Sequence, residues 1–276
     1  MGWADIERAF NRALYLSFSR KRLLVTFPAL VLCGILIVFC RALSLDATPW
    51  LRLSLGFLPI FLSSGVLLAL GVVLSRFYYH EAKQIAVNVR RLISSSMDLI
   101  IGISYLSVPS LLLYLLFWIV LGIFFLLKEI PGIGEFFSVV LSFGPFLLIF
   151  GSLVLCLFNL ALLFFVAPAA TLQSMRKGAL AKRVFESLKM RSFSAVILFF
   201  IGLIPLLFIS GFLCLAGVLT NTSFFLSEGS MAMAMEWFFI MIPFAALVTP
   251  PVVFFFNFSA ESYALLQTAP ESGLSR

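Results

Sequence analysis

Long apolar runs alternate with short polar stretches along the chain. Each run is about 20 residues or longer, which is the length a helix needs to cross a hydrocarbon core of about 30 Å. The runs fall at residues 23–43, 53–79, 99–127, 136–168, 193–220 and 237–259. The pattern therefore predicts an all-α fold, a polytopic transmembrane helical bundle of about six spans.

Three of the polar stretches are predicted to form basic amphipathic helices on the cytoplasmic side of the membrane. These stretches are Trp3–Arg22, Glu81–Asp98 and Leu172–Arg191. In the third, apolar residues recur at helical spacing from Leu172 to Leu188, and lysine and arginine fall mostly between them. Each stretch leads into an apolar run, so we expect it to lie along the membrane surface rather than cross it.

A basic surface helix followed by a hydrophobic hairpin is expected to occur three times within one membrane domain, residues 1–276. The repeat units are 3–80, 81–168 and 169–260, and a short, loose polar tail follows at 261–276. Each surface helix has an arginine four or five residues before a serine near the entry to a span; these arginines are Arg12, Arg91 and Arg183. The alternative is that any basic surface helix feeding a span has this appearance.

Composition and charge agree with a membrane protein. The chain is 62% hydrophobic and 11% charged, whereas a soluble domain is about 25% charged. Under the six-span map, sixteen of the nineteen lysines and arginines fall on one side, and Arg41, Arg52 and Lys128 fall on the other. Because positive loops stay in the cytoplasm, this bias predicts that the N- and C-termini are both cytoplasmic.

The basic faces are the main functional lead, because lysine and arginine near the cytoplasmic leaflet attract anionic lipid headgroups. Orientation of the spans is the alternative use of these charges. The net charge of +7 lies beside membrane spans, so no nucleic acid partner is expected. The expected contacts with anionic phospholipid are Arg12, Arg20, Lys21, Arg22, Arg90, Arg91, Lys182, Arg183 and Lys189.

Few polar groups are expected within the spans. Asn159 and Asn257 are the candidates for intramembrane polar contacts, either as interhelical hydrogen bonds or as contacts to a substrate. Arg41, Arg76 and Glu261 lie at predicted span ends, from which they are expected to reach the interface. Pro109 is expected to bend the third span, and Thr249-Pro250-Pro251 is expected to break the sixth.

No catalytic, cofactor or metal site is predicted. Cys33, Cys40, Cys156 and Cys214 lie inside apolar runs without a metal-binding spacing, and His80 is the sole histidine. The pattern therefore favours a membrane-organising, lipid-interacting or accessory protein rather than an enzyme. The alternative is a carrier for an apolar or amphipathic small molecule that uses the kinked spans. A protein partner or a homo-oligomer is left open.

One family resemblance comes from the third unit. Val166–Phe200, with the surface segment AKRVFESLK at 181–189, resembles the membrane domain joined to some glycerophosphodiester phosphodiesterases and similar bacterial integral membrane proteins. The resemblance includes no phosphodiesterase domain, so it implies no catalytic residue. It implies a bacterial inner-membrane protein.

Overall fold

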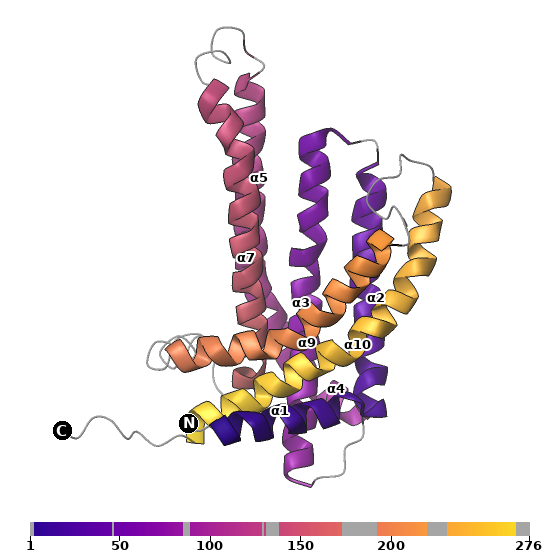
Figure 1. Cartoon of the computed structure of the whole chain (residues 1–276), viewed down its shortest axis with the longest axis vertical. Helices are drawn as coiled ribbons and strands as arrows, with labels where there is room; N and C mark the ends of the chain where they lie inside the picture. The colour runs from indigo at the N-terminus through magenta and orange to yellow at the C-terminus, as the bar shows by residue number, and fades with distance from the viewer. Residues whose placement is uncertain are drawn as a thin grey trace, which may run out of the picture.

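The structure is a computed structural model of the chain, and it describes residues 3–45, 47–84, 89–128, 130, 138–172, 192–219 and 231–268. No strand occurs in this part of the chain, so the predicted all-α fold is confirmed (Figure 1). In chain order the elements are α1 (Trp3–Ser17), α2 (Arg20–Leu43), α3 (Pro49–Ala82), α4 (Val89–Ser104), the 3-10 turn η1 (Tyr105–Ser107), α5 (Val108–Lys128), α7 (Ser138–Leu172), α9 (Ser192–Leu219) and α10 (Met231–Thr268).

The predicted number of spans is confirmed within the described ranges. Six stretches there are long and apolar enough to cross a membrane, and each overlaps one predicted run. They are Arg20–Leu43, Trp50–Ala82, Leu99–Leu127, Phe146–Thr171, Ser194–Leu219 and Met235–Leu266.

The helices form an up-and-down bundle (Figure 1). α2 and α3 form one antiparallel pair and α5 and α7 form another, while α9 and α10 cross them at a tilt. α10 packs against α1, α2, α3, α7 and α9, so it is the central helix of the described bundle. α1 lies across one end of the bundle and packs against the C-terminal half of α10 (Figure 1). This end also holds the first turn of α2 and the last turns of α3, and we call it the α1 end.

The third span is interrupted just before Pro109, the residue at which the sequence predicted a bend. α4 stops at Ser104, the backbone tightens into η1, and α5 starts at Val108. Proline has no N–H to donate and its ring crowds the preceding turn, so a regular α-helix is interrupted just before it. The turn is held against α3, because the Ser104 hydroxyl donates to the Gly65 carbonyl at 3.2 Å.

Two expectations for the sixth span were wrong. α10 runs unbroken through Pro250 and Pro251, with the Thr249 hydroxyl donating to the Ala245 carbonyl at 2.6 Å. A hydroxyl bond of this kind and close packing on neighbouring helices let a membrane helix tolerate proline. The helix also continues to Thr268, so the first half of the expected loose tail is helical, and Glu261 and Ser262 are buried.

The main core lies where α10, α7, α3 and α9 meet. Phe164 of α7 contacts Phe255 of α10, with ring centroids 5.4 Å apart, and the Ser259 hydroxyl donates to the Phe164 carbonyl. Gly71 of α3 lets these helices approach closely, because a Cβ there would lie 2.5 Å from Phe256 Cε1 and 2.8 Å from Ala167 Cβ. Small residues commonly allow such contacts between membrane helices.

The structure describes the first two predicted surface helices but not most of the third. α1 corresponds to the first stretch. In the second stretch α3 continues to Ala82, a turn follows at Lys83 and Gln84, and α4 begins at Val89 and runs beyond Asp98. In the third stretch, residues 173–191 lie outside the described part of the chain. The threefold repeat therefore stays a prediction.

Candidate functional site

α1 packs against the bundle through its small residues. Ala9, Ala13 and Ser17 are buried, and they recur every four residues along the side of α1 that faces α10. The Ser17 hydroxyl donates to the Ala13 carbonyl at 2.7 Å, so it leaves no unpaired group in the contact. Phe10 adds an edge-to-face contact with Phe254, with ring centroids 5.0 Å apart. These contacts hold one face of α1 against α10 and leave the opposite face outward.

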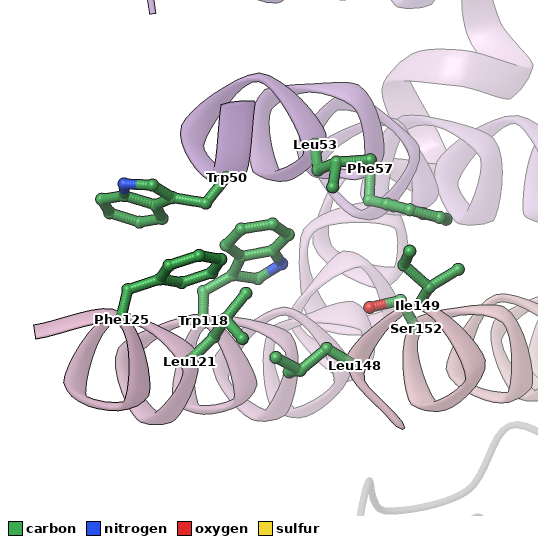
Figure 2. Close-up of a pocket in the computed structure, with 9 residues that line it drawn as sticks. All are labelled: Trp50, Leu53, Phe57, Trp118, Leu121, Phe125, Leu148, Ile149 and Ser152. Carbon is green, nitrogen blue, oxygen red and sulfur yellow. The ribbon is translucent and has the colours of Figure 1, made fainter. Parts of the chain in front are cut away.

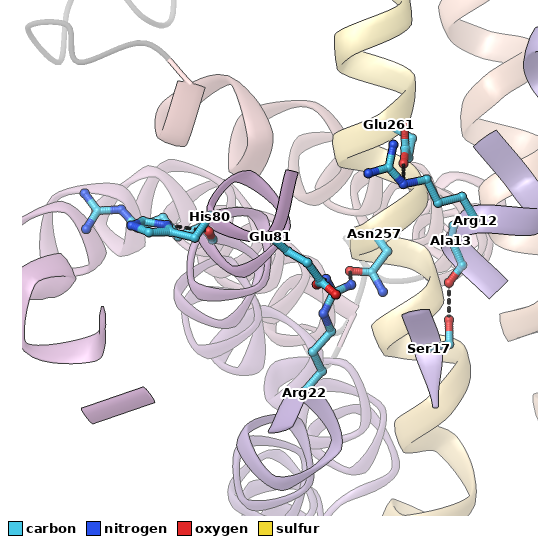
Figure 3. Close-up of polar contacts among 9 residues, drawn as sticks. Arg12, Ala13, Ser17, Arg22, His80, Glu81, Asn257 and Glu261 are labelled. Carbon is cyan, nitrogen blue, oxygen red and sulfur yellow. Dashed lines mark hydrogen bonds and ion pairs between the residues drawn. The ribbon is translucent and has the colours of Figure 1, made fainter. Parts of the chain in front are cut away.

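A buried arginine lies in the first turn of α2, which follows α1 in the chain. The Arg22 side chain is only 1% exposed, and its guanidinium donates to the Asn257 Oδ1 atom at 2.5 Å and to the Glu81 carboxylate (Figure 3). Arg22 belongs to α2, Glu81 to α3 and Asn257 to α10. A buried guanidinium is tolerated only when its charge and donors are satisfied. The arrangement therefore joins three helices through one side chain.

A second ion pair lies beside the first. The Arg12 Nε atom of α1 is 3.2 Å from the Glu261 Oε1 atom of α10, and the Glu261 side chain is mostly buried (Figure 3). The Arg12 guanidinium also lies over the Tyr78 ring of α3, 5.5 Å from its centroid. A cation over an aromatic face is attracted to the ring's negative electron density. We call Arg12, Arg22, Glu81, Asn257 and Glu261 together the ionic cluster.

The ionic cluster corrects one expectation drawn from the sequence. Glu261 was expected to reach the membrane interface, but it is buried and faces Arg12. Arg76 likewise contacts the protein, since its Nη1 atom donates to the Ser96 hydroxyl at 2.6 Å and to the Ser95 carbonyl at 3.1 Å. Glu261 and Arg76 therefore interact with other residues of the protein, because neighbouring helices place polar partners close to both side chains.

The basic residues proposed to contact lipid are found in three situations. Arg20 and Lys21 are exposed, and Arg12 is 53% exposed even though it is paired with Glu261. Arg22 is enclosed by protein, so its guanidinium is not presented to headgroups in this structure. Arg90 and Arg91 belong to α4, whereas Lys182, Arg183 and Lys189 lie outside the described residues.

The two intramembrane asparagines are both buried. Asn159 of α7 faces α5, where its Oδ1 atom accepts a long hydrogen bond of 3.5 Å from the Ser110 hydroxyl. Asn257 accepts from Arg22, while its Nδ2 atom has no hydrogen-bond partner in the described part of the chain. Both contacts join separate helices, as interhelical hydrogen bonds between membrane helices do.

The partners of Arg22 were missed at the level of sequence. Glu81 was assigned to a surface helix, and Asn257 was considered without a charged neighbour. One signal for a buried Arg22 was present in the sequence. Arg20 and Lys21 already mark the membrane boundary, and Arg22 follows them inside α2. His80, next to Glu81, makes a 2.8 Å contact from its Nδ1 atom to the Arg76 carbonyl.

The chain matches none of the protein-family models, curated proteins or solved structures with which it was compared. The class of this protein is therefore assigned from its fold alone. The six long apolar helices found among the described residues make this chain a multi-pass α-helical membrane protein.

Proposed function

We propose that the protein is a lipid-interacting component of the cytoplasmic membrane, with a membrane-organising or accessory role. The observation that carries this proposal is that aromatic and basic side chains are exposed along α1 and the first turn of α2. The aromatic residues are Trp3, Tyr15 and Phe18, and the basic ones are Arg20 and Lys21. Aromatic rings favour the headgroup region, and lysine and arginine attract anionic lipids there.

The ionic cluster supports the proposal because it holds this surface in place. Arg12 links α1 to α10, and Arg22 links the first turn of α2 to α3 and α10. Arg20 and Lys21 therefore project from a helix whose position is set by buried contacts. A preorganised site loses less conformational entropy on binding than a free polybasic segment does.

Orientation is the first testable part of the proposal: the α1 end should face the cytoplasm. In a variant without the four native cysteines, Thr48→Cys and Lys83→Cys place exposed thiols at opposite ends of α3. An impermeant thiol reagent added to intact cells is expected to label Thr48→Cys and to leave Lys83→Cys unlabelled until the membrane is opened. The opposite labelling pattern would reverse the orientation.

Lipid preference is the second testable part. In bilayers that mix phosphatidylglycerol with phosphatidylcholine, native mass spectrometry should find phosphatidylglycerol retained preferentially. At about 1 kcal/mol per basic residue, the double variant Arg20→Gln/Lys21→Gln is expected to weaken that preference roughly thirtyfold.

Arg52→Gln is the matched control for this experiment. It removes an exposed arginine from the opposite end of α3. We expect it to leave the preference for phosphatidylglycerol unchanged. Equal retention of both lipids by the unsubstituted protein, or equal losses in the control and the double variant, would contradict the proposed function.

A further inference from the structure

The ion pair between Arg22 and Glu81 is buried on one side and exposed on the other. The Arg22 side chain is 1% exposed, whereas the Glu81 side chain is 56% exposed. The guanidinium donates through Nη1 to Asn257 and through Nη2 to the Glu81 carboxylate (Figure 3). Asn257 is itself enclosed by protein. Of these two acceptors, Glu81 is therefore the one that a group from outside the chain can replace.

Glu81 lies at an unfavourable place on its own helix. It belongs to the last turn of α3, which ends at Ala82 and is followed by the turn at Lys83 and Gln84. The last carbonyl groups of a helix lack donors within the helix and carry partial negative charge, so they repel a carboxylate. The ion pair with Arg22 therefore holds Glu81 against the dipole of α3.

Arg22, by contrast, lies where an anion is favoured. It belongs to the first turn of α2, whose N–H groups and positive dipole end attract negative charge. This turn contains no acidic residue, and Ser19 at the N-cap makes no side-chain hydrogen bond to it. Arg20 and Lys21 in the same turn are exposed. The Glu81 carboxylate is thus an anion that the chain itself supplies to this end of α2.

The pocket at the opposite end of α3 is not a comparable site. It is small and lies between the first turns of α3 and the α5–α7 pair (Figure 2). An anion there would lose its hydration without gaining a counter-charge, because the described lining residues carry none. These residues include Trp50, Phe57, Trp118, Phe125, Leu148 and Ser152.

We propose that Glu81 competes with the phosphate group of an anionic lipid for Arg22, so that a bound headgroup displaces Glu81 from the guanidinium. A guanidinium binds phosphate as it binds carboxylate, often through two parallel hydrogen bonds. Arg22 lies near the end of a membrane span, which is the level of the headgroups. The displaced carboxylate turns outward, on the side where Glu81 is already exposed.

This inference rests on the proposed function and adds its regulation. Arg20 and Lys21 attract the anionic headgroup, and Glu81 sets how tightly the headgroup is held. The apparent affinity of a ligand falls with the fraction of the protein that is competent to bind it. Every molecule in which Glu81 stays paired with Arg22 lowers that fraction.

Removal of the competing charge is the first test. Glu81→Gln is expected to raise the preference for phosphatidylglycerol over phosphatidylcholine about fivefold in native mass spectrometry, because one charge near the surface contributes about 1 kcal/mol. Glu7→Gln is the matched control, since it removes an exposed acid from α1 without freeing Arg22. It should raise the preference clearly less.

Two double variants of equal charge show whether the gain depends on Arg22. Arg22→Met/Glu81→Gln and Lys83→Gln/Glu81→Gln each combine the loss of one acid with the loss of one base. Lys83 is exposed and follows Glu81 by two residues. The variant without Arg22 is expected to lose the gain of Glu81→Gln, whereas the variant without Lys83 should keep most of it.

A stability measurement covers the case in which Glu81→Gln folds poorly, and it separates lipid from free phosphate. Without Glu81 the buried guanidinium lacks its anionic partner, so a phosphate that binds there stabilises the folded state. Phosphatidylglycerol added to detergent micelles is expected to raise the unfolding temperature of Glu81→Gln more than that of the unsubstituted protein. Phosphatidylcholine and inorganic phosphate should not do so.

Four results would overturn the proposal. They are equal gains in Glu81→Gln and Glu7→Gln, equal behaviour of the two double variants, no preferential stabilisation of Glu81→Gln by phosphatidylglycerol, and stabilisation by inorganic phosphate to the same extent. Each of them leaves the proposed function standing if the unsubstituted protein still prefers phosphatidylglycerol. Equal retention of both lipids by the unsubstituted protein would instead contradict the proposed function.

Discussion

Glu81→Ala is expected to lower the free energy of unfolding by about 3 kcal/mol. Arg22 is 1% exposed, so without Glu81 its guanidinium stays buried with Asn257 as its remaining hydrogen-bond partner. Breaking a buried ion pair by removing one partner typically costs about 3–5 kcal/mol. The lower end of this range applies because the Glu81 side chain is itself 56% exposed, and water screens part of the interaction. Unfolding in detergent can be followed with a thiol-reactive dye, because Cys33 and Cys40 are buried in the folded protein.

Two further variants show whether the stability lost in Glu81→Ala comes from the unpaired charge of Arg22. Glu7→Ala removes an exposed acid from α1 at the same end and should change stability by less than about 0.5 kcal/mol. The double variant Arg22→Met/Glu81→Ala should be more stable than Glu81→Ala alone, because no buried charge remains. If Glu81→Ala is as stable as Glu7→Ala, the Arg22 contact does not stabilise the bundle.

Gly71→Leu is expected to destabilise the protein by a similar amount, about 3 kcal/mol. The Cβ atom alone would lie within 2.8 Å of side chains from two other helices, Phe256 of α10 and Ala167 of α7. Forcing extra atoms into a packed core costs about 1–3 kcal/mol, and leucine adds far more than one methyl group. The same dye assay measures the loss, and Gly71→Ala should show a smaller one.

The control for this substitution is Gly122→Leu in α5. A Cβ at position 122 would meet no atom within 4 Å, so leucine there should leave stability unchanged or raise it slightly through its better helix propensity. Equal losses at positions 71 and 122 would mean that leucine is tolerated poorly in any span. That result would contradict a special role for the Gly71 contact.

Prediction from sequence succeeded where the deciding physics is local. An apolar run must be long enough to cross the hydrocarbon, and each helix satisfies its own backbone hydrogen bonds, so runs in the sequence indicate spans directly. The interruption before Pro109 is local in the same sense. The Pro250-Pro251 pair shows the limit, because α10 stays continuous through it while packed on several neighbouring helices.

The ionic cluster could not be predicted in the same way. Arg22 is separated from Glu81 by 59 residues and from Asn257 by 235, so no local pattern connects them. Arg20, Lys21 and Arg22 are neighbours in the sequence, but successive residues on a helix point about 100° apart. Two of them therefore face outward, while the third points between α3 and α10.

The amino-acid sequence by itself determined that this chain is an all-α protein with six membrane-length helices, because length and hydropathy suffice for that. It also marked the α1 end as basic, since charge is a property of composition. Only the tertiary structure decided which of those charges are buried as pairs and which remain exposed. Only the packing of α3 on α5 and α7 brought Trp118 and Ser152 into one pocket, because such contacts depend on how distant helices meet.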